Sequence, residues 1–339
     1  MLNRREFLGV GAACAVSLVG AREVARSESR FSRTYAPHFG MFRHHVGSDP
    51  IDQIKLLADE GFTAVEDSGL RAKPASLQAR VGAELARRKM SMGLFVGMAD
   101  FGRPTFASGC RDLRRGVLRV LQAAVETAHR VGGRSLAVVP GKSVPSLPRS
   151  VQVRHAVETL QFCADVCETH DLTLLLEPID HGMGSSRLFL RTADQAAELC
   201  RAVGRPSCRL LFDVYQQAVA GENVPRLLVQ TSDVLGYVQL ADAPGRKEPG
   251  TGEIDFQQLL AVLDAIGYRG VFGMEHGNVM PGKAGERAVI EAYRALERWS
   301  YRPRAASRTA DRQAATSSSV ISKTSIDSPM RAIGLKYGK

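Results

Sequence analysis

The stretch Gly236-Tyr237-Val238-Gln239-Leu240-Ala241-Asp242-Ala243-Pro244-Gly245 contains the repeating unit from which the fold can be predicted. Its apolar run, residues 237–240, has the length of a buried strand, and it ends in a loop rich in glycine, proline and charged residues. Gln239 lies inside that run, where burying an amide without hydrogen-bond partners would cost roughly a few kcal/mol. We therefore expect polar partners for Gln239 at the end of this strand.

Short apolar runs of this kind alternate with longer amphipathic segments from residue 35 to residue 298. The runs predict eight strands, at residues 36–42, 62–66, 91–96, 135–139, 172–176, 209–212, 237–240 and 271–274. Segments with helical spacing follow them, at residues 50–60, 75–89, 110–131, 149–170, 192–203, 225–231, 254–266 and 284–299. Eight strand-then-helix units predict a single-domain (β/α)8 TIM barrel over residues 32–300. The rival fold, a doubly wound sheet, needs a G-x-G-x-x-G turn that is absent after the first run.

The two ends of the chain differ in composition from the predicted barrel. Residues 1–28 begin with Asn3-Arg4-Arg5-Glu6-Phe7-Leu8 and a short apolar segment, and they resemble a twin-arginine signal peptide. That segment is shorter than the about 20 residues that span a bilayer, so we expect cleavage, a periplasmic or otherwise exported protein, and no membrane association afterwards. Residues 301–339 are rich in Arg, Ser, Thr and Ala, which predicts a disordered basic tail.

The net charge of +10 is concentrated at the ends of the chain. Residues 302–339 hold eight Lys or Arg against two Asp or Glu, and residues 1–30 hold five against three. The near-neutral body gives no reason to expect a nucleic-acid partner. The six cysteines form no CxxC pair, and Cys163 and Cys167, four residues apart, are expected to be small buried apolar residues.

Four of the predicted strands carry polar residues at their carboxyl ends, which in a barrel face one cavity. Glu177 follows the fifth run, Asp213 the sixth and Glu275 the eighth, while Gln239 lies within the seventh. Three carboxylates brought together would repel one another unless a cation lay between them. Because all four donors are oxygens, the set favours Mg²⁺ or Mn²⁺ over Zn²⁺.

These motifs together resemble the xylose isomerase-like barrel family of sugar isomerases and epimerases, over about residues 35–298. The resemblance rests on Glu177-Pro178, Asp213-Val214-Tyr215, Gly236 to Asp242 with Pro244, Arg246, Glu248-Pro249-Gly250 and Gly252-Glu253, and Gly273-Met274-Glu275. Most of the family has His at the position of Gln239, whereas the hydroxypyruvate isomerase branch has Gln. The chain is therefore most similar to that branch.

The resemblance implies roles for the residues that match. Glu177, Asp213, Gln239 and Glu275 would be the metal ligands, and Glu177 and Glu275 would also be the catalytic acid/base pair. Arg246 would bind a hydroxyl or carboxylate of the substrate.

One position departs from the family pattern. Gln216 stands where the family usually has a substrate-contacting His, and an amide can bind a hydroxyl but cannot titrate near neutral pH. His181 and His276, near the ends of the fifth and eighth runs, could compensate; His44 and His45 are weaker candidates. We therefore expect Gln216 and His181 to bind substrate, which is either hydroxypyruvate, converted to tartronate semialdehyde, or a related small hydroxy-carbonyl compound or sugar.

The predicted function is a divalent-metal-dependent aldose–ketose isomerase that acts through an enediolate on a small hydroxy-carbonyl or sugar substrate. A sugar epimerase or a sugar-acid dehydratase of the same fold would use the same pair of glutamates. An endonuclease IV-like phosphodiesterase would need several His ligands for three zinc ions, and the chain has eight His in all. A non-catalytic sugar-binding barrel is a further alternative, and a homo-oligomer is left open.

Overall fold

The nine strands found in residues 30–180 and 187–300 form a closed parallel barrel. The computed structural model describes residues 30–180 and 187–300, so the predicted signal peptide, the basic tail and His181 lie outside the described residues. The strands are β1 (Thr34–Pro37), β2 (Ala64–Val65), β3 (Ser91–Met92), β4 (Leu94–Ala99), β5 (Ser135–Val139), β6 (Thr173–Leu176), β7 (Cys208–Asp213), β8 (Leu235–Gln239) and β9 (Val271–Met274).

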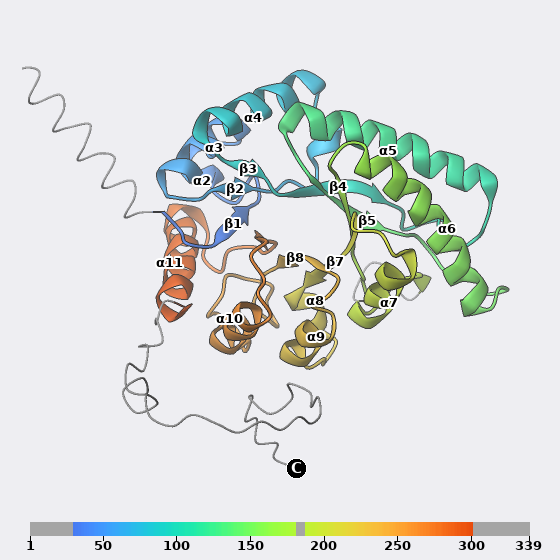
Figure 1. The fold of residues 1–339 in the computed structure, drawn as a ribbon. Helices are drawn as coiled ribbons and strands as arrows, with labels where there is room; N and C mark the ends of the chain where they lie inside the picture. The colour runs from blue at the N-terminus through green and yellow to red at the C-terminus, as the bar shows by residue number, and fades with distance from the viewer. Residues whose placement is uncertain (1–29, 181–186, 301–339) are drawn as a thin grey trace, which may run out of the picture. The chain divides into compact units, whose positions relative to one another are not determined.

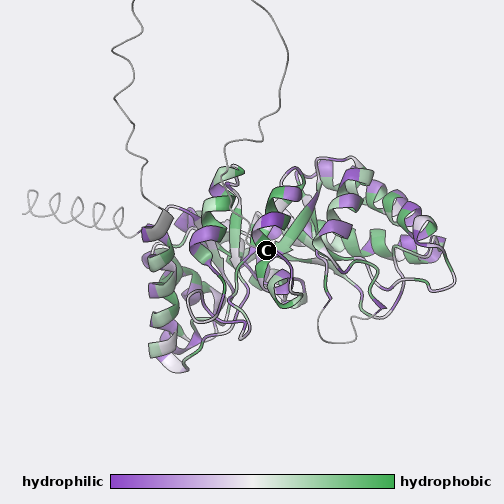
Figure 2. Cartoon of the chain, turned by 90° about the horizontal axis from the view of Figure 1, so that it is seen from below, coloured by the Kyte–Doolittle hydropathy of each residue, from purple (hydrophilic) through white to green (hydrophobic). Residues whose placement is uncertain are grey.

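Helices follow most strands and surround the barrel (Figure 1). They are α2 (Arg43–Val46), α3 (Pro50–Asp59), α4 (Ala75–Arg88), α5 (Arg111–Val131), α6 (Arg149–Glu168), α7 (Ala193–Val203), α8 (Val214–Val219), α9 (Val224–Gln230), α10 (Phe256–Ala265) and α11 (Gly282–Ser300), with a short 3₁₀ turn at Leu70–Ala72. Hydrophobic and hydrophilic residues both occur along the helices (Figure 2). In α5 the buried residues recur at helical spacing, so one face packs on the strands.

Two sets of paired strands, joined at both of their edges, make up the barrel. Seven strands pair in the order β1-β9-β8-β7-β6-β5-β4, and β2 pairs with β3, all in parallel. A parallel bridge between His38 and Glu66 joins the end of β1 to the end of β2. Since β3 runs into β4 through Gly93 alone, the ring is complete, and the predicted (β/α)8 TIM barrel is confirmed.

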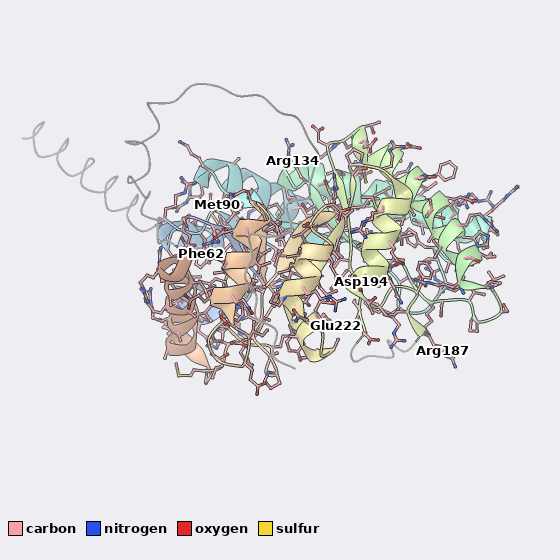
Figure 3. The ribbon with its side chains drawn as sticks, turned by 60° about the horizontal axis from the view of Figure 1, so that its bottom comes forward. Phe62, Met90, Arg134, Arg187, Asp194 and Glu222 are labelled. Carbon is pink, nitrogen blue, oxygen red and sulfur yellow. The ribbon has the colours of Figure 1, made fainter. Side chains whose placement is uncertain are left out.

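The inside of the barrel is filled by one layer of apolar side chains, from Leu94, Ala137, Leu175, Leu211 and Tyr237. Because side chains alternate along a strand, residues two positions further on also face inward, at the carboxyl end of the barrel. The opposite faces of the strands pack against the helices in the larger core cluster. In Figure 3, Met90 and Arg134, which precede β3 and β5, lie toward one end of the barrel, and Arg187, which follows β6, lies toward the other.

Two predicted strands differ from those observed. The first was expected at residues 36–42, but β1 ends at Pro37 and the chain then turns into α2. The third is divided at Gly93, where a Cβ atom would lie 2.7 Å from the Tyr237 hydroxyl and 3.1 Å from the Val65 carbonyl oxygen. The close approach of these two groups explains why only glycine fits there.

The described cysteines are unpaired, and Cys163 and Cys167 are buried as predicted. Burial raises the pKa of Cys167 to about 12, which keeps its thiol protonated at neutral pH. Within residues 30–180 and 187–300, no helix combines the length and the apolar character that crossing a membrane requires.

Candidate active site

The carboxyl ends of four adjacent strands bring the predicted ligands together. Asp213 and Gln239 are the last residues of β7 and β8, where they pair in register, and Glu177 and Glu275 directly follow β6 and β9. Carboxylate oxygens of Glu177, Asp213 and Glu275 all lie within 4.8 Å of one another. Each of the four residues is two positions beyond an inward-facing residue of its strand, which explains why residues far apart in sequence lie together at the carboxyl end of the barrel.

The three carboxylates hold protons more tightly than isolated ones. Burial raises the pKa of Asp213 to about 6, although Arg246 and the backbone N–H groups of Gln216 and Tyr215 oppose the rise. Burial and the neighbouring Asp213 raise the pKa of Glu275 to about 7. Burial, with repulsion from Glu275 and Asp213, also raises the pKa of Glu177 well above its usual value. The cluster therefore favours added positive charge, as a proton or as a cation.

Arg246 supplies one cation directly to this cluster. Its Nη2 atom lies 3.0 Å from Asp213 Oδ2 and 3.0 Å from Glu275 Oε2, and its guanidinium carbon lies 5.1 Å from the centre of the Tyr215 ring. The residue itself has a left-handed backbone, with φ of 49°, in the loop after β8. Strained backbone of this kind is often found where a side chain must be aimed at a functional site.

Two amide oxygens in the site have no hydrogen-bond partner among the described residues. They are Oε1 of Gln239 and Oε1 of Gln216, and both side chains are buried. A buried acceptor without a donor is costly, so each oxygen suits a cation or a donor group of a ligand. Gln239 Oε1 and the three carboxylates form an oxygen donor set of the type that hard divalent ions prefer, and the residues therefore fit a metal such as Mg²⁺ or Mn²⁺.

Two further residues, Glu66 and His38, lie at the carboxyl ends of β2 and β1 and were not predicted as site residues from the sequence. Glu66 is 0% exposed; it accepts a hydrogen bond of 2.8 Å from the Tyr237 hydroxyl, and its Oε1 atom lies 2.9 Å from Nε2 of His38. Burial lowers the pKa of His38, but attraction to Glu66 and the hydrogen bond between them outweigh it and raise the pKa. The sequence does contain a pattern that could have indicated Glu66: this glutamate stands at the end of the second apolar run, as Glu177 stands at the end of the fifth.

The acidic groups of the site outnumber its cations. When the carboxylates of Glu66, Glu177, Asp213 and Glu275 are ionised, Arg246 supplies one positive charge, and His38 supplies a second only when its ring is protonated. This leaves two or three negative charges in excess, most or all of which a divalent cation would offset. The charge count and the donor set thus favour the same kind of ion.

The other histidines that the sequence indicated contact residues outside the cluster of Glu177, Asp213 and Glu275. His276 stacks on Tyr293 and its Nε2 lies 3.0 Å from the Tyr293 hydroxyl, and burial lowers its pKa to about 4. The ring is therefore neutral and packed against α11. His44 and His45 both bind Glu286, a buried carboxylate of α11, through side-chain and backbone nitrogens. These contacts give His44 and His45 a structural role.

The loop that carries Arg246 is held by Asp242, which is 1% exposed. Its Oδ1 accepts hydrogen bonds from the backbone N–H groups of Ala243 and Ile254, and its Oδ2 accepts three more, from Gly250, Thr251 and Gly252. One carboxylate thus ties both ends of the loop together. Gly252 is required for this closure, because a Cβ atom there would lie 2.1 Å from the Ala243 carbonyl oxygen.

Replacing Asp242 by alanine is expected to lower the free energy of unfolding by roughly 3 kcal/mol or more, because five backbone donors lose their acceptor. Urea unfolding monitored by circular dichroism measures the change. Asp255→Ala is the matched control: Asp255 caps α10 by accepting one bond from Gln258 N, and its loss should cost about 1 kcal/mol. Equal effects of the two substitutions would contradict the anchoring role of Asp242.

Comparisons with known proteins agree with this geometry. The family model for the xylose isomerase-like TIM barrel matches residues 54–299. A hydroxypyruvate isomerase of Escherichia coli (strain K12) is 34% identical over 49% of this chain and 64% of its own length. A 2-oxo-tetronate isomerase of Pectobacterium atrosepticum is 26% identical over 67% of this chain and 86% of its own length.

Among solved structures, an AP endonuclease, family 2, from Brucella melitensis is similar with a TM-score of 0.62 and 25% identity, over 75% of this chain and 96% of that one. The sequence relatives confirm the prediction that this enzyme is an isomerase. With the family model matched over most of the barrel, this chain belongs to the xylose isomerase-like TIM barrel family.

Proposed function

We propose that the protein is a divalent-metal-dependent isomerase that moves the carbonyl group of a small hydroxy-keto acid to the neighbouring hydroxyl-bearing carbon through an enediolate, as in an aldose–ketose interconversion. The observation that carries this proposal is the cluster of Glu177, Asp213 and Glu275, whose oxygens lie within 4.8 Å of one another beside the unpartnered Oε1 of Gln239. This arrangement combines a metal donor set with two carboxylates that can move protons.

The ion would be held by the oxygens of Glu177, Asp213, Gln239 and Glu275. It would supply stabilisation of the negative charge that develops on the substrate oxygens. The sequence and the donor set support Mg²⁺ or Mn²⁺, because all four donors are oxygens.

Glu177 and Glu275 are the proposed acid/base pair. One carboxylate takes the proton from the hydroxyl-bearing carbon, and a proton is returned to the neighbouring carbon, which was the carbonyl carbon. The raised pKa values of both groups suit this work, because a general base acts best when its pKa is near the working pH. The two groups follow β6 and β9, on either side of Asp213 and Gln239.

Arg246 and Gln216 are the proposed substrate-binding residues. The Arg246 guanidinium can bind a substrate carboxylate through two parallel hydrogen bonds, which favours a hydroxy-keto acid over a neutral sugar. The buried, unpartnered Oε1 of Gln216 can accept a hydrogen bond from a substrate hydroxyl. His181 remains a predicted binding residue, because it lies outside the described residues.

The names of the relatives supply two candidate substrates, hydroxypyruvate and 2-oxo-tetronate. Each compound is incubated with the Mn²⁺-loaded protein in D₂O, and the reaction is monitored by NMR. We expect deuterium incorporation next to the carbonyl group and formation of the isomeric product. No incorporation into any hydroxy-keto acid or ketose would refute the isomerase proposal. Inversion of a ketose stereocentre would identify an epimerase instead, and loss of water a sugar-acid dehydratase.

The proposed location of the protein is the periplasm. The Arg4-Arg5 segment supports export through the twin-arginine pathway to the periplasm, where the protein would act on small molecules without a membrane or nucleic-acid partner. Fractionation of cells that express the full chain would test this. Recovery of the protein in the cytoplasmic fraction alone, with residues 1–28 intact, would contradict it.

A further inference from the structure

His38 lies in the same inward-facing layer as the proposed metal ligands. Ala36 faces the barrel interior, because a Cβ atom on Gly93 would lie 3.3 Å from Ala36 Cβ and 2.7 Å from the Tyr237 hydroxyl. His38 is two residues further along and so faces the same side. The register of β1 with β9 pairs Pro37 with Met274, which places His38 and Glu275 at neighbouring strand ends.

The imidazole ring of His38 is fixed from one side. Its Nε2 lies 2.9 Å from Glu66 Oε1, and the other Glu66 oxygen accepts the hydroxyl hydrogen of Tyr237 at 2.8 Å. Space for the buried Glu66 carboxylate is left by Gly273, where a Cβ atom would lie 2.3 Å from Oε2. Because Nε2 is the ring nitrogen at ion-pair distance from the carboxylate, we assign the hydrogen of the neutral ring to Nε2, which leaves Nδ1 to exchange a proton.

Nδ1 of His38 is available to a ligand. Among the described residues no hydrogen bond reaches this atom, and the His38 side chain is 21% exposed whereas Glu66 is fully buried. The ring also interacts electrostatically with Glu275. A histidine that is held by a carboxylate through one ring nitrogen can exchange a proton through the other.

Isomerisation through an enediolate requires a proton transfer that the two glutamates do not supply. One C–H bond breaks and a new one forms on the neighbouring carbon, which occupies Glu177 and Glu275. In addition, the hydroxyl oxygen loses its proton to become the new carbonyl oxygen, and the old carbonyl oxygen gains one. Gln216 cannot perform this step, since an amide does not titrate near neutral pH.

We propose that His38, positioned by Glu66 and Tyr237, carries the proton between the two substrate oxygens: Nδ1 takes it from the hydroxyl oxygen and returns it to the former carbonyl oxygen. No oxidant or further reactant is needed, because one proton leaves one oxygen and one proton reaches the other. The inference rests on the proposed isomerase function and assigns a catalytic residue to it.

The test compares two rates in the Mn²⁺-loaded protein with hydroxypyruvate and with 2-oxo-tetronate. Conversion to product needs the oxygen-to-oxygen transfer, whereas deuterium exchange at the hydroxyl-bearing carbon needs only the carboxylate base. His38→Gln keeps an N–H group for Glu66 but cannot carry a proton. We expect conversion to fall by about 10²-fold or more, with exchange reduced far less, so that the ratio of exchange to conversion rises.

His129→Gln is the matched control, because His129 is exposed near the end of α5, and both of its rates should equal those of the wild type. His38→Asn provides a second variant if His38→Gln does not fold. A ratio unchanged in the folded His38 variants, whether both rates fall equally or neither falls, overturns the role of His38. A wild type that neither exchanges nor converts overturns the proposed function, and this inference with it.

Discussion

Replacing Glu275 by glutamine is expected to lower the isomerisation rate by at least about 10²- to 10⁴-fold, the range assigned to a lost general acid or base. Glutamine keeps an oxygen that can still donate to an ion, but it cannot accept a proton from carbon. The loss should therefore fall on kcat more than on Mn²⁺ affinity, which isothermal titration calorimetry measures. Glu177→Gln should have an effect of the same order, because the reaction needs both carboxylates.

A glutamate outside the cluster provides the control for this charge change. Glu222 lies in the exposed turn after α8 (Figure 3), and Glu222→Gln should leave kcat unchanged. If folded Glu275→Gln retained activity within about tenfold of the wild type, the carboxylate would not be a general acid or base. A large rise in KM alone would instead indicate that Glu275 only binds substrate.

The metal-free protein is expected to lose stability as the pH rises from about 5 to 8, and added Mn²⁺ is expected to reverse the loss. The pKa of Asp213 is about 6 and that of Glu275 about 7, against usual values of 3.8 and 4.5. Below their usual values both groups are protonated in the folded and unfolded states. Between the usual and the raised values the folded state binds more protons, so stability falls with rising pH.

Thermal unfolding of the protein in EDTA and in Mn²⁺, at several pH values, measures this effect. An ion at 100 times its dissociation constant would add about 2.7 kcal/mol, and its affinity should increase with pH because ligating carboxylates must be deprotonated. Asp213→Asn should flatten the pH dependence in EDTA. A metal-free protein that is equally stable at pH 5 and pH 8 would contradict the burial and mutual repulsion that raise the pKa values of these carboxylates.

Most of the fold could be predicted because barrel strands are buried and continuous in sequence. Runs such as residues 135–139 and 271–274 coincide with β5 and β9, and Thr192 caps α7 by accepting a bond from Gln195 N. The first strand was predicted too far along the chain because Phe39, Met41 and Phe42 continue the apolar pattern after β1 has ended. Apolar residues in the turn after a strand are not separable from the strand by pattern alone.

The residues of the site were harder to predict from the sequence than the fold. The ends of β6 to β9 carry polar residues at or directly after their apolar runs, and those residues were recognised. By contrast, Glu66 was counted as part of the second run, residues 62–66, and His38 as part of the first, residues 36–42, so neither was singled out. The contact between Glu66 and Tyr237 joins residues 171 positions apart, and only the closed barrel brings them together.

Arg246 also affects how an ion would enter the site. Its guanidinium nitrogen lies 3.0 Å from Asp213 and 3.0 Å from Glu275, so an ion held by the proposed ligands would compete with Arg246 for the same two carboxylates. Each carboxylate contact that the ion took over would leave the guanidinium freer to bind an anionic group. Metal binding and substrate binding would therefore be linked through Arg246, and an anionic substrate would bind more tightly to the metal-loaded protein.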